Sequence, residues 1–211
     1  MSRRELLTNV VRLAFAALAI VAMTYQFATI QEQGRSGAHF FSFFTIQSNI
    51  LCVAALLLLV LVRRQERTGL FDGARCAAVL YMAITGVVFA LLLAGLQEEL
   101  QTTVPWVDFV VHELMPVVLI ADWLLDPPRH RLPRWAALAW LAYPLAWLAY
   151  TLARGEIVDW YPYPFVDVST HGYGGVLARG LVLSIGFAGA AFALLWIGNR
   201  RAGRSTTVVA A

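Results

Sequence analysis

Six long apolar stretches, separated by short polar connections, constrain this chain more than any other feature. They cover approximately residues 8–28, 39–62, 75–97, 105–126, 135–153 and 173–198. Each is close to the roughly 20 apolar residues that an α-helix needs to cross the hydrocarbon core of a bilayer. The sequence therefore predicts an all-α, polytopic integral membrane protein. Because the connections are short, we expect a single six-helix transmembrane domain over residues 1–211, with a disordered tail at 205–211.

The charged residues agree with this class and predict an orientation. Hydrophobic residues make up 60% of the chain and charged residues only 14%, which lies outside the range of soluble domains. All 16 basic residues are arginines, and twelve of them lie at the N-terminus, in the second and fourth connections, or at the C-terminus. The positive-inside rule therefore places both termini in the cytoplasm. Arginines in short connections are typical of membrane orientation rather than of nucleic-acid binding, so we expect no nucleic-acid partner.

The second apolar stretch carries hydroxyl and amide side chains in its first half. Ser42, Thr45 and Asn49 recur three or four residues apart, so a helix would place them on one side. Polar groups at membrane depth are costly and therefore indicate either a functional site or hydrogen bonds between helices. The structural alternative for Thr45 is a hydrogen bond from its hydroxyl to the backbone of its own helix.

The fourth apolar stretch carries an ionisable pair at helical spacing. Asp108 and His112 lie four residues apart, so the carboxylate can hold the histidine ring and select its tautomer. Thr45 and His112 lie about six or seven residues from the outer ends of their predicted helices, roughly 10 Å deep at a rise of 1.5 Å per residue. A hydroxyl, a histidine and an orienting acid together form an activated nucleophile. We therefore expect Thr45 to face His112, the first as nucleophile and the second as base.

Other polar residues near this depth are candidates for supporting roles. Glu113 is a second acid that is able to orient His112. Asn49 or Arg179 is suited to bind an oxyanion or a substrate carboxylate. The structural alternative for Arg179 is an ion pair with Glu113 or Asp108.

Two other classes of function stay open on the residues alone. A zinc-dependent lipid hydrolase would need a ligand set that gathers on the outer side and activates water. The candidate ligands are His39, Asp108, His112 and His171. Buried acidic, basic and histidine side chains are also typical of a proton, ion or small-molecule carrier.

Three short motifs together resemble a known family of membrane enzymes. They are Phe44-Thr45-Ile46 with Asn49, the segment His112–Pro116 that runs into Ile120-Ala121-Asp122-Trp123, and Trp160-Tyr161-Pro162-Tyr163-Pro164-Phe165. They look like those of the bacterial six-helix relatives of the androgen-induced membrane hydrolases, a family that includes the androgen-dependent regulator of tissue factor pathway inhibitor. The likeness covers most of the chain in the order and hydropathy of its segments.

The resemblance implies a function and a set of site residues. Animal members of the family are threonine hydrolases that cleave fatty acid esters of hydroxy fatty acids. The family nucleophile falls on Thr45 and the base on His112, whereas a shifted register of the surrounding aromatic residues would put Ser42 at the nucleophile position. The implied protein is a lipid-ester hydrolase of the bacterial cytoplasmic (inner) membrane that needs no cofactor. Its expected partners are a fatty acyl ester and the membrane lipids, and no motif indicates an oligomeric partner.

Overall fold

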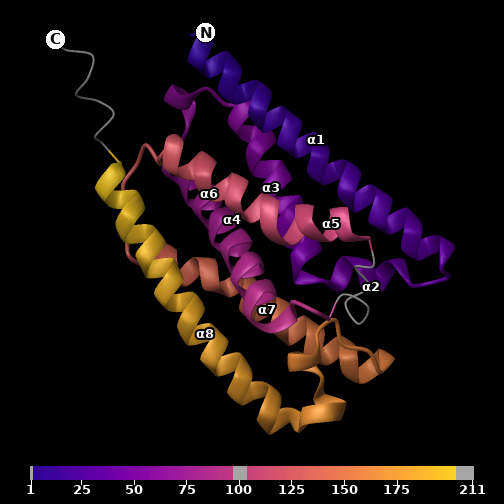
Figure 1. Ribbon diagram of the computed structural model, residues 1–211. Coiled ribbons are helices and arrows are strands. Elements are labelled where there is room, and N and C mark those ends of the chain that lie inside the picture. The colour runs from indigo at the N-terminus through magenta and orange to yellow at the C-terminus, as the bar shows by residue number, and fades with distance from the viewer. Residues whose placement is uncertain (1, 97–103, 203–211) are drawn as a thin grey trace.

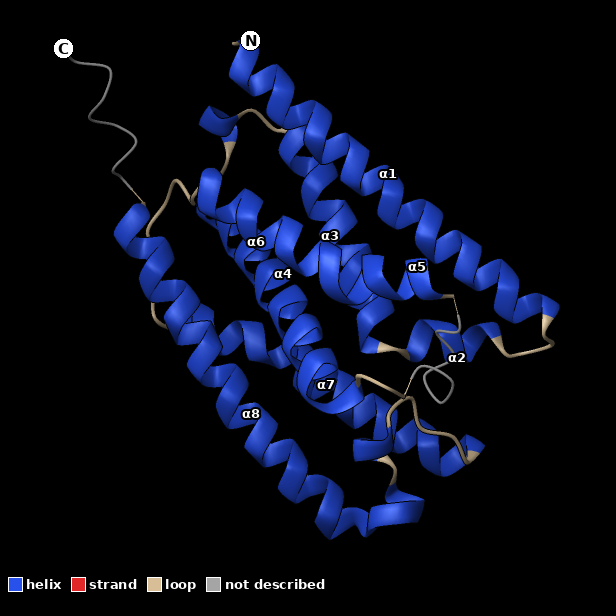
Figure 2. Cartoon of the chain, in the orientation of Figure 1, coloured by secondary structure: helices blue, strands red, loops and turns tan. Residues whose placement is uncertain are grey.

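The chain folds into a bundle of helices. The computed structural model describes residues 2–96 and 104–202, and no strand occurs within those ranges (Figures 1 and 2). The α-helices are α1 (Arg3–Glu32), α2 (Gly37–Ser42), α3 (Phe44–Leu61), α4 (Gly69–Val88), α5 (Pro105–Phe109), α6 (Met115–Leu125), α7 (Trp135–Val158) and α8 (Val168–Arg201). Four short segments complete them: the 3₁₀ turns η1 (Arg64–Glu66) and η4 (Pro164–Val166), and the π-helical turns η2 (Phe89–Leu93) and η3 (Val110–Leu114). The predicted tail at 205–211 and the last residue of the predicted helix 75–97 lie outside the described residues.

Five helices in the described part of the chain are long and apolar enough to cross a membrane. They are α1, α3, α4 together with η2, α7 and α8. The outer helices expose apolar side chains: Leu181, Val182 and Ile185 of α8 are 63%, 69% and 65% exposed. A contiguous apolar surface of this kind is unfavourable in water and compatible with contact to lipid. The architecture is therefore that of a helical protein suited to a membrane.

The predicted helix 105–126 is built from shorter pieces. The π-helical turn η3 separates α5 from α6. Pro116, the second residue of α6, has no N–H to donate to a carbonyl one turn earlier. Regular α-helical hydrogen bonding is therefore lost just before the proline, and this segment is a broken helix.

Three helices, α1, α4 and α8, begin earlier than hydropathy predicts, because polar side chains cap them. α1 begins directly after Ser2, which forms a reciprocal capping box with Glu5. α4 begins after Thr68, whose hydroxyl accepts the N–H of Phe71. Asp167 caps α8 in the same way. Hydropathy marks only the apolar part of a helix, whereas the capping residue sets its first turn.

The predicted continuous helix over 39–62 is wrong in one respect: it is two helices that meet at Phe43. The backbone of Phe43 is extended, with φ −67° and ψ 128°. The first backbone-to-backbone hydrogen bond at the start of α3 is that of Gln47, whose N–H donates to the carbonyl of Phe43 at 3.2 Å. The three N–H groups between these residues, including that of Thr45, have no acceptor within the helix. The break therefore places a helix N-terminus inside the bundle.

Side chains from elsewhere stabilise this break. The carbonyl of Phe41 accepts the side-chain N–H of Gln47 at 2.8 Å. The carbonyl of Ser42 accepts the indole N–H of Trp147, in α7, at 2.9 Å. These bonds replace the helical hydrogen bonds that the two carbonyls would otherwise receive, so the cost of the interruption is offset.

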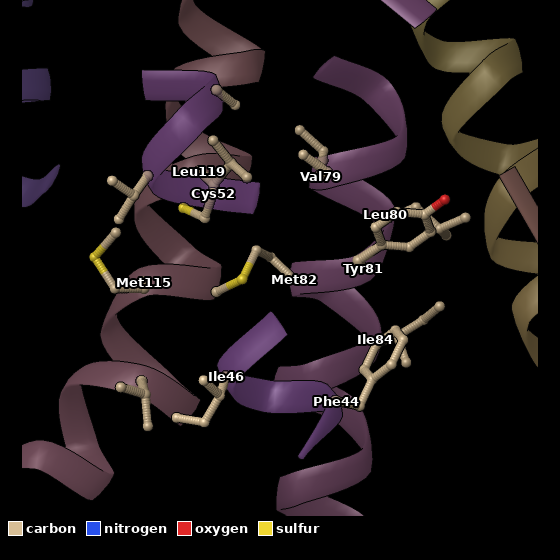
Figure 3. Packing of buried hydrophobic residues seen from close by; sticks show 14 of the residues in the cluster. Phe44, Ile46, Cys52, Val79, Leu80, Tyr81, Met82, Ile84, Met115 and Leu119 are labelled. Atoms are coloured by element: carbon tan, nitrogen blue, oxygen red, sulfur yellow. The ribbon is translucent and has the colours of Figure 1, made fainter. Parts of the chain in front are cut away.

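The centre of the bundle is the apolar contact among α3, α4 and α6. Figure 3 shows the side chain of Met82 of α4 directed toward Met115 of α6. Leu119 of α6 and Ile46 and Cys52 of α3 lie close by. Met82, Met115, Leu119 and Cys52 are all fully buried. Because such a core is close-packed, it holds α3 at a fixed distance from the broken helix.

A buried ion-pair network joins the helices at one end of the bundle, where α1 begins and α8 ends (Figure 1). Arg12 of α1 and Arg75 of α4 lie 2.7 Å and 2.6 Å from the two carboxylate oxygens of Asp122. Arg12 and Arg67 each lie 2.7 Å from Asp126. The three arginine side chains are at most 5% exposed. Since a buried charge needs a partner, the network fixes α1, α4 and α6 relative to one another.

Candidate active site

Polar residues of α3 and of the broken helix meet inside the bundle. Thr45 is the second residue of α3, and its hydroxyl oxygen lies 3.2 Å from Nε2 of His112 in η3. Nδ1 of His112 lies 2.8 Å from Oδ1 of Asp108. Thr45, His112 and Asp108 are 6%, 3% and 6% exposed. The structure thus brings together the three residues whose depth and spacing predict a catalytic site.

Asn49 ties the two backbones of this site together. Its side-chain N–H group donates to the carbonyl of Thr45 at 2.9 Å and to the carbonyl of Val111 at 3.0 Å. Val111 lies in the π-helical turn before Pro116, where carbonyls lack a regular helical donor. Asn49 is fully buried. Its amide nitrogen is therefore engaged in holding η3 against α3, and not in the oxyanion role that we expected as one option.

The ring of His112 is also contacted by the first residue of η2, directly after α4. The ring of Phe89 stacks on it with a centroid distance of 4.2 Å and an interplanar angle of 10°. One turn earlier, Gly86 lets α4 approach closely, since an added Cβ there would lie 3.2 Å from Cβ of Pro116. Packing on both sides therefore restricts His112 to one ring orientation.

Tyr163 completes the cluster, although its residue type and position in the sequence do not assign it a chemical role. It lies in the connection between α7 and α8 and is 5% exposed. Its phenol oxygen lies 3.2 Å from the hydroxyl oxygen of Thr45 and accepts the backbone N–H of Thr45 at 3.2 Å. That N–H is one of those left free by the break at Phe43. The aromatic and proline-rich segment 160–165 is the only sequence signal that points to this connection.

These contacts define one directional chain of hydrogen bonds. With Asp108 ionised, Nδ1 of His112 carries a proton that the carboxylate accepts, so Nε2 is an acceptor. Nε2 then accepts the O–H of Thr45. Because the oxygen of Tyr163 accepts the backbone N–H of Thr45, its own O–H is free to donate to the Thr45 hydroxyl oxygen. That oxygen can lose its proton to a base while a second O–H stabilises the charge that develops on it.

Burial keeps Tyr163 in its donor form. Burial raises the pKa of the phenol above its ordinary value, and the hydrogen bonds from Thr45 and from the backbone of Phe44 oppose this rise only in part. The ordinary tyrosine pKa is about 10, so the phenol is protonated at neutral pH. Tyr163 is therefore a hydrogen-bond donor under ordinary conditions.

Three predicted site residues lie away from these hydrogen bonds. The hydroxyl of Ser42 donates to the carbonyl of Ala38 at 2.8 Å and lies 3.2 Å from the hydroxyl of Tyr150. Glu113 is exposed, and so is Arg179, which forms no ion pair with any described residue. Of the two acids considered for orienting His112, Asp108 is the one in contact with it, and Arg179, considered for an oxyanion or a substrate carboxylate, is not among the hydrogen-bond partners of the Thr45 hydroxyl. The rotation of their helical segments turns the side chains of Glu113 and Arg179 outward.

The four residues considered as zinc ligands do not gather. The ring of His39 stacks on Trp160 at a centroid distance of 3.9 Å, away from the Asp108–His112 pair. Over residues 2–96 and 104–202, no group of three or more His, Cys, Asp or Glu side chains is arranged to hold a metal ion. The predicted set with His39, Asp108, His112 and His171 is therefore not assembled.

Two mainly apolar cavities meet at Thr45 and Tyr163. The larger, of about 90 Å³, lies among α3, α4, α7 and α8. The smaller, of about 20 Å³, lies between α1, α3 and the broken helix, and His112 is part of its wall. Thr45 and Tyr163 line both. The hydroxyl of Thr45 thus lies at the junction of two spaces suited to hydrocarbon.

The width of the larger cavity depends on a proline and a glycine. Pro144 interrupts the hydrogen bonding of α7, and the carbonyl of Trp140, four residues earlier, instead accepts the hydroxyl of Tyr81 at 2.8 Å. Gly180 of α8 faces Leu148, since an added Cβ would lie 3.3 Å from Cδ2 of that leucine. A larger side chain at position 180 would therefore extend into the cavity.

Comparison of the chain with protein-family models, with curated proteins and with solved structures finds no match. A buried hydroxyl lies next to a histidine that has an acid behind it, and a second hydroxyl donates to the same oxygen. Apolar space adjoins it on two sides. This combination is suited to acyl transfer onto the hydroxyl of Thr45.

Proposed function

We propose that this protein is an intramembrane lipid-ester hydrolase in which Thr45 is the nucleophile and His112 the general base. The observation that carries the proposal is the 3.2 Å contact between the Thr45 hydroxyl and Nε2 of His112, with Asp108 2.8 Å behind the ring. A hydroxyl, an imidazole and a carboxylate in series activate the hydroxyl for attack on a carbonyl. The resemblance of the motifs to those of membrane threonine hydrolases points to the same reaction.

The reaction has two halves. His112 takes the proton of Thr45 while the Thr45 oxygen bonds to the ester carbonyl carbon and the π electrons move to the carbonyl oxygen. The intermediate then collapses, the bond to the leaving alcohol breaks, and His112 returns the proton to that alcohol. Water then attacks the acyl carbon while His112 takes one of its protons. The bond to the Thr45 oxygen breaks, His112 returns the proton to that oxygen, and the carboxylic acid leaves. Asp108 stabilises the imidazolium in both halves.

The two cavities favour an ester with a hydrocarbon chain on each side of its carbonyl group. The larger cavity would receive the longer apolar part and the smaller cavity the other. A fatty acid ester of a hydroxy fatty acid has this shape, so we propose this class as the substrate. The surrounding membrane lipids would supply it laterally, and the steps above use no cofactor.

We further propose that the broken helix over 105–126 is a sixth membrane crossing, and that both termini lie on the cytoplasmic side of a bacterial inner membrane. Arg12, Arg67 and Arg75 support this orientation, because they cluster at the end of the bundle where α1 begins (Figure 1). Arginine-rich ends stay in the cytoplasm. The Thr45 site would then lie nearer the outer leaflet.

The test is hydrolysis by the purified protein. It should release free fatty acid from a fatty acid ester of a hydroxy fatty acid, and Thr45→Ala and His112→Ala should each lower kcat by at least about 100-fold. A fluorophosphonate probe should label Thr45, as mapped by mass spectrometry. Ser42→Ala is the matched control and should keep both turnover and labelling, because its hydroxyl bonds to Ala38 rather than to His112.

Three results would contradict the proposal. Full activity in Thr45→Ala with loss in Ser42→Ala would move the nucleophile to Ser42. Hydrolysis that is abolished by a chelator, with zinc bound to the purified protein, would indicate a metal-activated water. A pH-dependent ion flux into liposomes without ester turnover would identify a carrier instead.

A further inference from the structure

We propose that Tyr163 is a third catalytic residue, whose O–H donates first to the Thr45 oxygen and then to the oxyanion formed by attack on the ester. This inference rests on the hydrolase function proposed above. It starts from geometry, because the phenol oxygen lies 3.2 Å from both the hydroxyl oxygen and the backbone nitrogen of Thr45. Among the described side chains, only Tyr163 and His112 hydrogen-bond to the Thr45 hydroxyl.

The two contacts give the phenol one hydrogen-bond direction. Its oxygen accepts the backbone N–H of Thr45, which has no acceptor within α3. When the Thr45 hydroxyl donates its proton to Nε2 of His112, the phenol is the donor in its own contact with the Thr45 hydroxyl oxygen. Tyr163 and His112 thus have opposite tasks: His112 removes the proton, and Tyr163 supports the negative charge.

The ring of Tyr163 is held rigidly, although it belongs to a connection between helices. It stacks on Phe165 with a centroid distance of 5.3 Å and packs edge-on against Phe43 at 5.5 Å. The ring centroid of Trp147, in α7, lies 5.7 Å from that of Tyr163. A donor fixed in this way needs little reorganisation when charge develops, which is what makes such a donor effective in catalysis.

The same O–H can serve the next charged atom in the reaction. When the Thr45 oxygen bonds to the carbonyl carbon, the negative charge moves to the carbonyl oxygen, one atom farther along. Rotation of the phenol O–H about its C–O bond redirects it to that oxygen. The N-terminus of α3 places the positive end of a helix dipole beside the same point. Tyr163 donates a hydrogen bond and transfers no proton, since His112 carries the proton throughout.

Tyr163→Phe in the full-length protein in lipid nanodiscs tests this role. With a fatty acid ester of a hydroxy fatty acid as substrate, we expect kcat to fall about 100- to 1000-fold, as on loss of an oxyanion donor, while KM stays within about threefold. The rate of fluorophosphonate labelling should fall in parallel. Tyr161→Phe is the matched control and should behave as the wild type, because its ring packs against Gly155 and the hydrogen bonds to Thr45 come from Tyr163 instead.

A second variant separates catalysis from support of the helix start. A fluorotyrosine at position 163 has a lower phenol pKa, so it loses its donor proton at lower pH and still accepts the Thr45 N–H. We expect the alkaline fall of kcat/KM to move to lower pH by the difference in phenol pKa. A hydroxyl that only caps α3 would leave this limb in place, and that result would overturn the inference even if Tyr163→Phe failed to fold.

The outcomes for the two proposals differ. Wild-type kcat in Tyr163→Phe, together with an inactive Thr45→Ala, would overturn the role of Tyr163 and leave the hydrolase proposal standing. Absence of both turnover and labelling in the wild-type protein would overturn the two together.

Discussion

At Thr45, position in the helix matters more than residue type. A threonine inside a membrane helix usually bonds to a carbonyl three or four residues earlier. Here the carbonyl four residues earlier is that of Phe41, which accepts the side-chain N–H of Gln47 instead. The helix is also interrupted at Phe43. The Thr45 hydroxyl therefore has partners from other segments, His112 and Tyr163.

Asp108 provides the sharpest test at the scale of a single residue. Asp108→Asn keeps the size of the side chain but presents an N–H to Nδ1 of His112, which favours the tautomer protonated on Nε2. That tautomer cannot accept the proton of Thr45, so we expect kcat to fall about 100- to 10,000-fold with little change in KM. Steady-state kinetics measure it, with Thr45→Ala as the baseline. A kcat within threefold of the wild type would show that Asp108 does not set the tautomer.

At the scale of elements, irregularities in two helical segments shape the two cavities beside Thr45. The break between α2 and α3 brings Thr45 to the junction of the cavities, and Pro144 in α7 opens the wall of the larger one. On α8, Gly180 and Ser184 line the same cavity with little side-chain volume. The accepted chain length should therefore depend on α7 and α8 rather than on the catalytic residues.

Under the proposed hydrolase function, Gly180→Leu should shorten the acyl chain that the protein accepts, because the new side chain enters the cavity beside Leu148. Each excluded methylene group should lower kcat/KM about fourfold, since burial of one such group contributes about 0.8 kcal/mol. A series of esters of increasing chain length measures this. Gly189→Leu, on the same helix and with open space around it, should leave the profile unchanged. Equal profiles for Gly180→Leu and the wild type would place the acyl chain elsewhere.

At the scale of the molecule, the two ends of the bundle have different tasks. One end carries the network of Arg12, Arg67 and Arg75 with two aspartates, which joins α1, α4 and α6. The Thr45 site lies toward the opposite end of the bundle. It is formed by the start of α3 and by the π-helical turn of the broken helix. The buried apolar cluster between the two ends packs the helices together and so fixes the position of one end relative to the other (Figure 3).

Asp126→Ala should destabilise the whole bundle, because it removes the carboxylate that pairs with buried Arg67 and one of the two that pair with buried Arg12. We expect the free energy of unfolding to fall by about 3–5 kcal/mol. Reaction of the buried thiols of Cys52 and Cys76 with a fluorescent maleimide reports unfolding on heating in detergent. Glu32→Ala removes an exposed carboxylate and should leave the transition unchanged. An unchanged transition in Asp126→Ala would show that the network contributes no stability.

The sequence by itself determined the helical class and part of the site. Stretches of about 20 apolar residues are compatible with few structures other than membrane-spanning helices. The four-residue spacing predicts the Asp108–His112 pair, which the structure forms at 2.8 Å. Counting residues from the helix ends also predicts that Thr45 faces His112. Both inferences depend on the regular geometry of a helix, which is the same in every sequence.

Only the tertiary structure decided the break at Phe43, the outward direction of Glu113 and Arg179, and the place of Tyr163 beside Thr45. Each of these depends on contacts between segments far apart in the chain. The break is stabilised by Trp147, and Tyr163 reaches Thr45 across 118 residues. Local periodicity specifies what a helix looks like, whereas its rotation, interruptions and polar partners follow from the packing of the other helices around it.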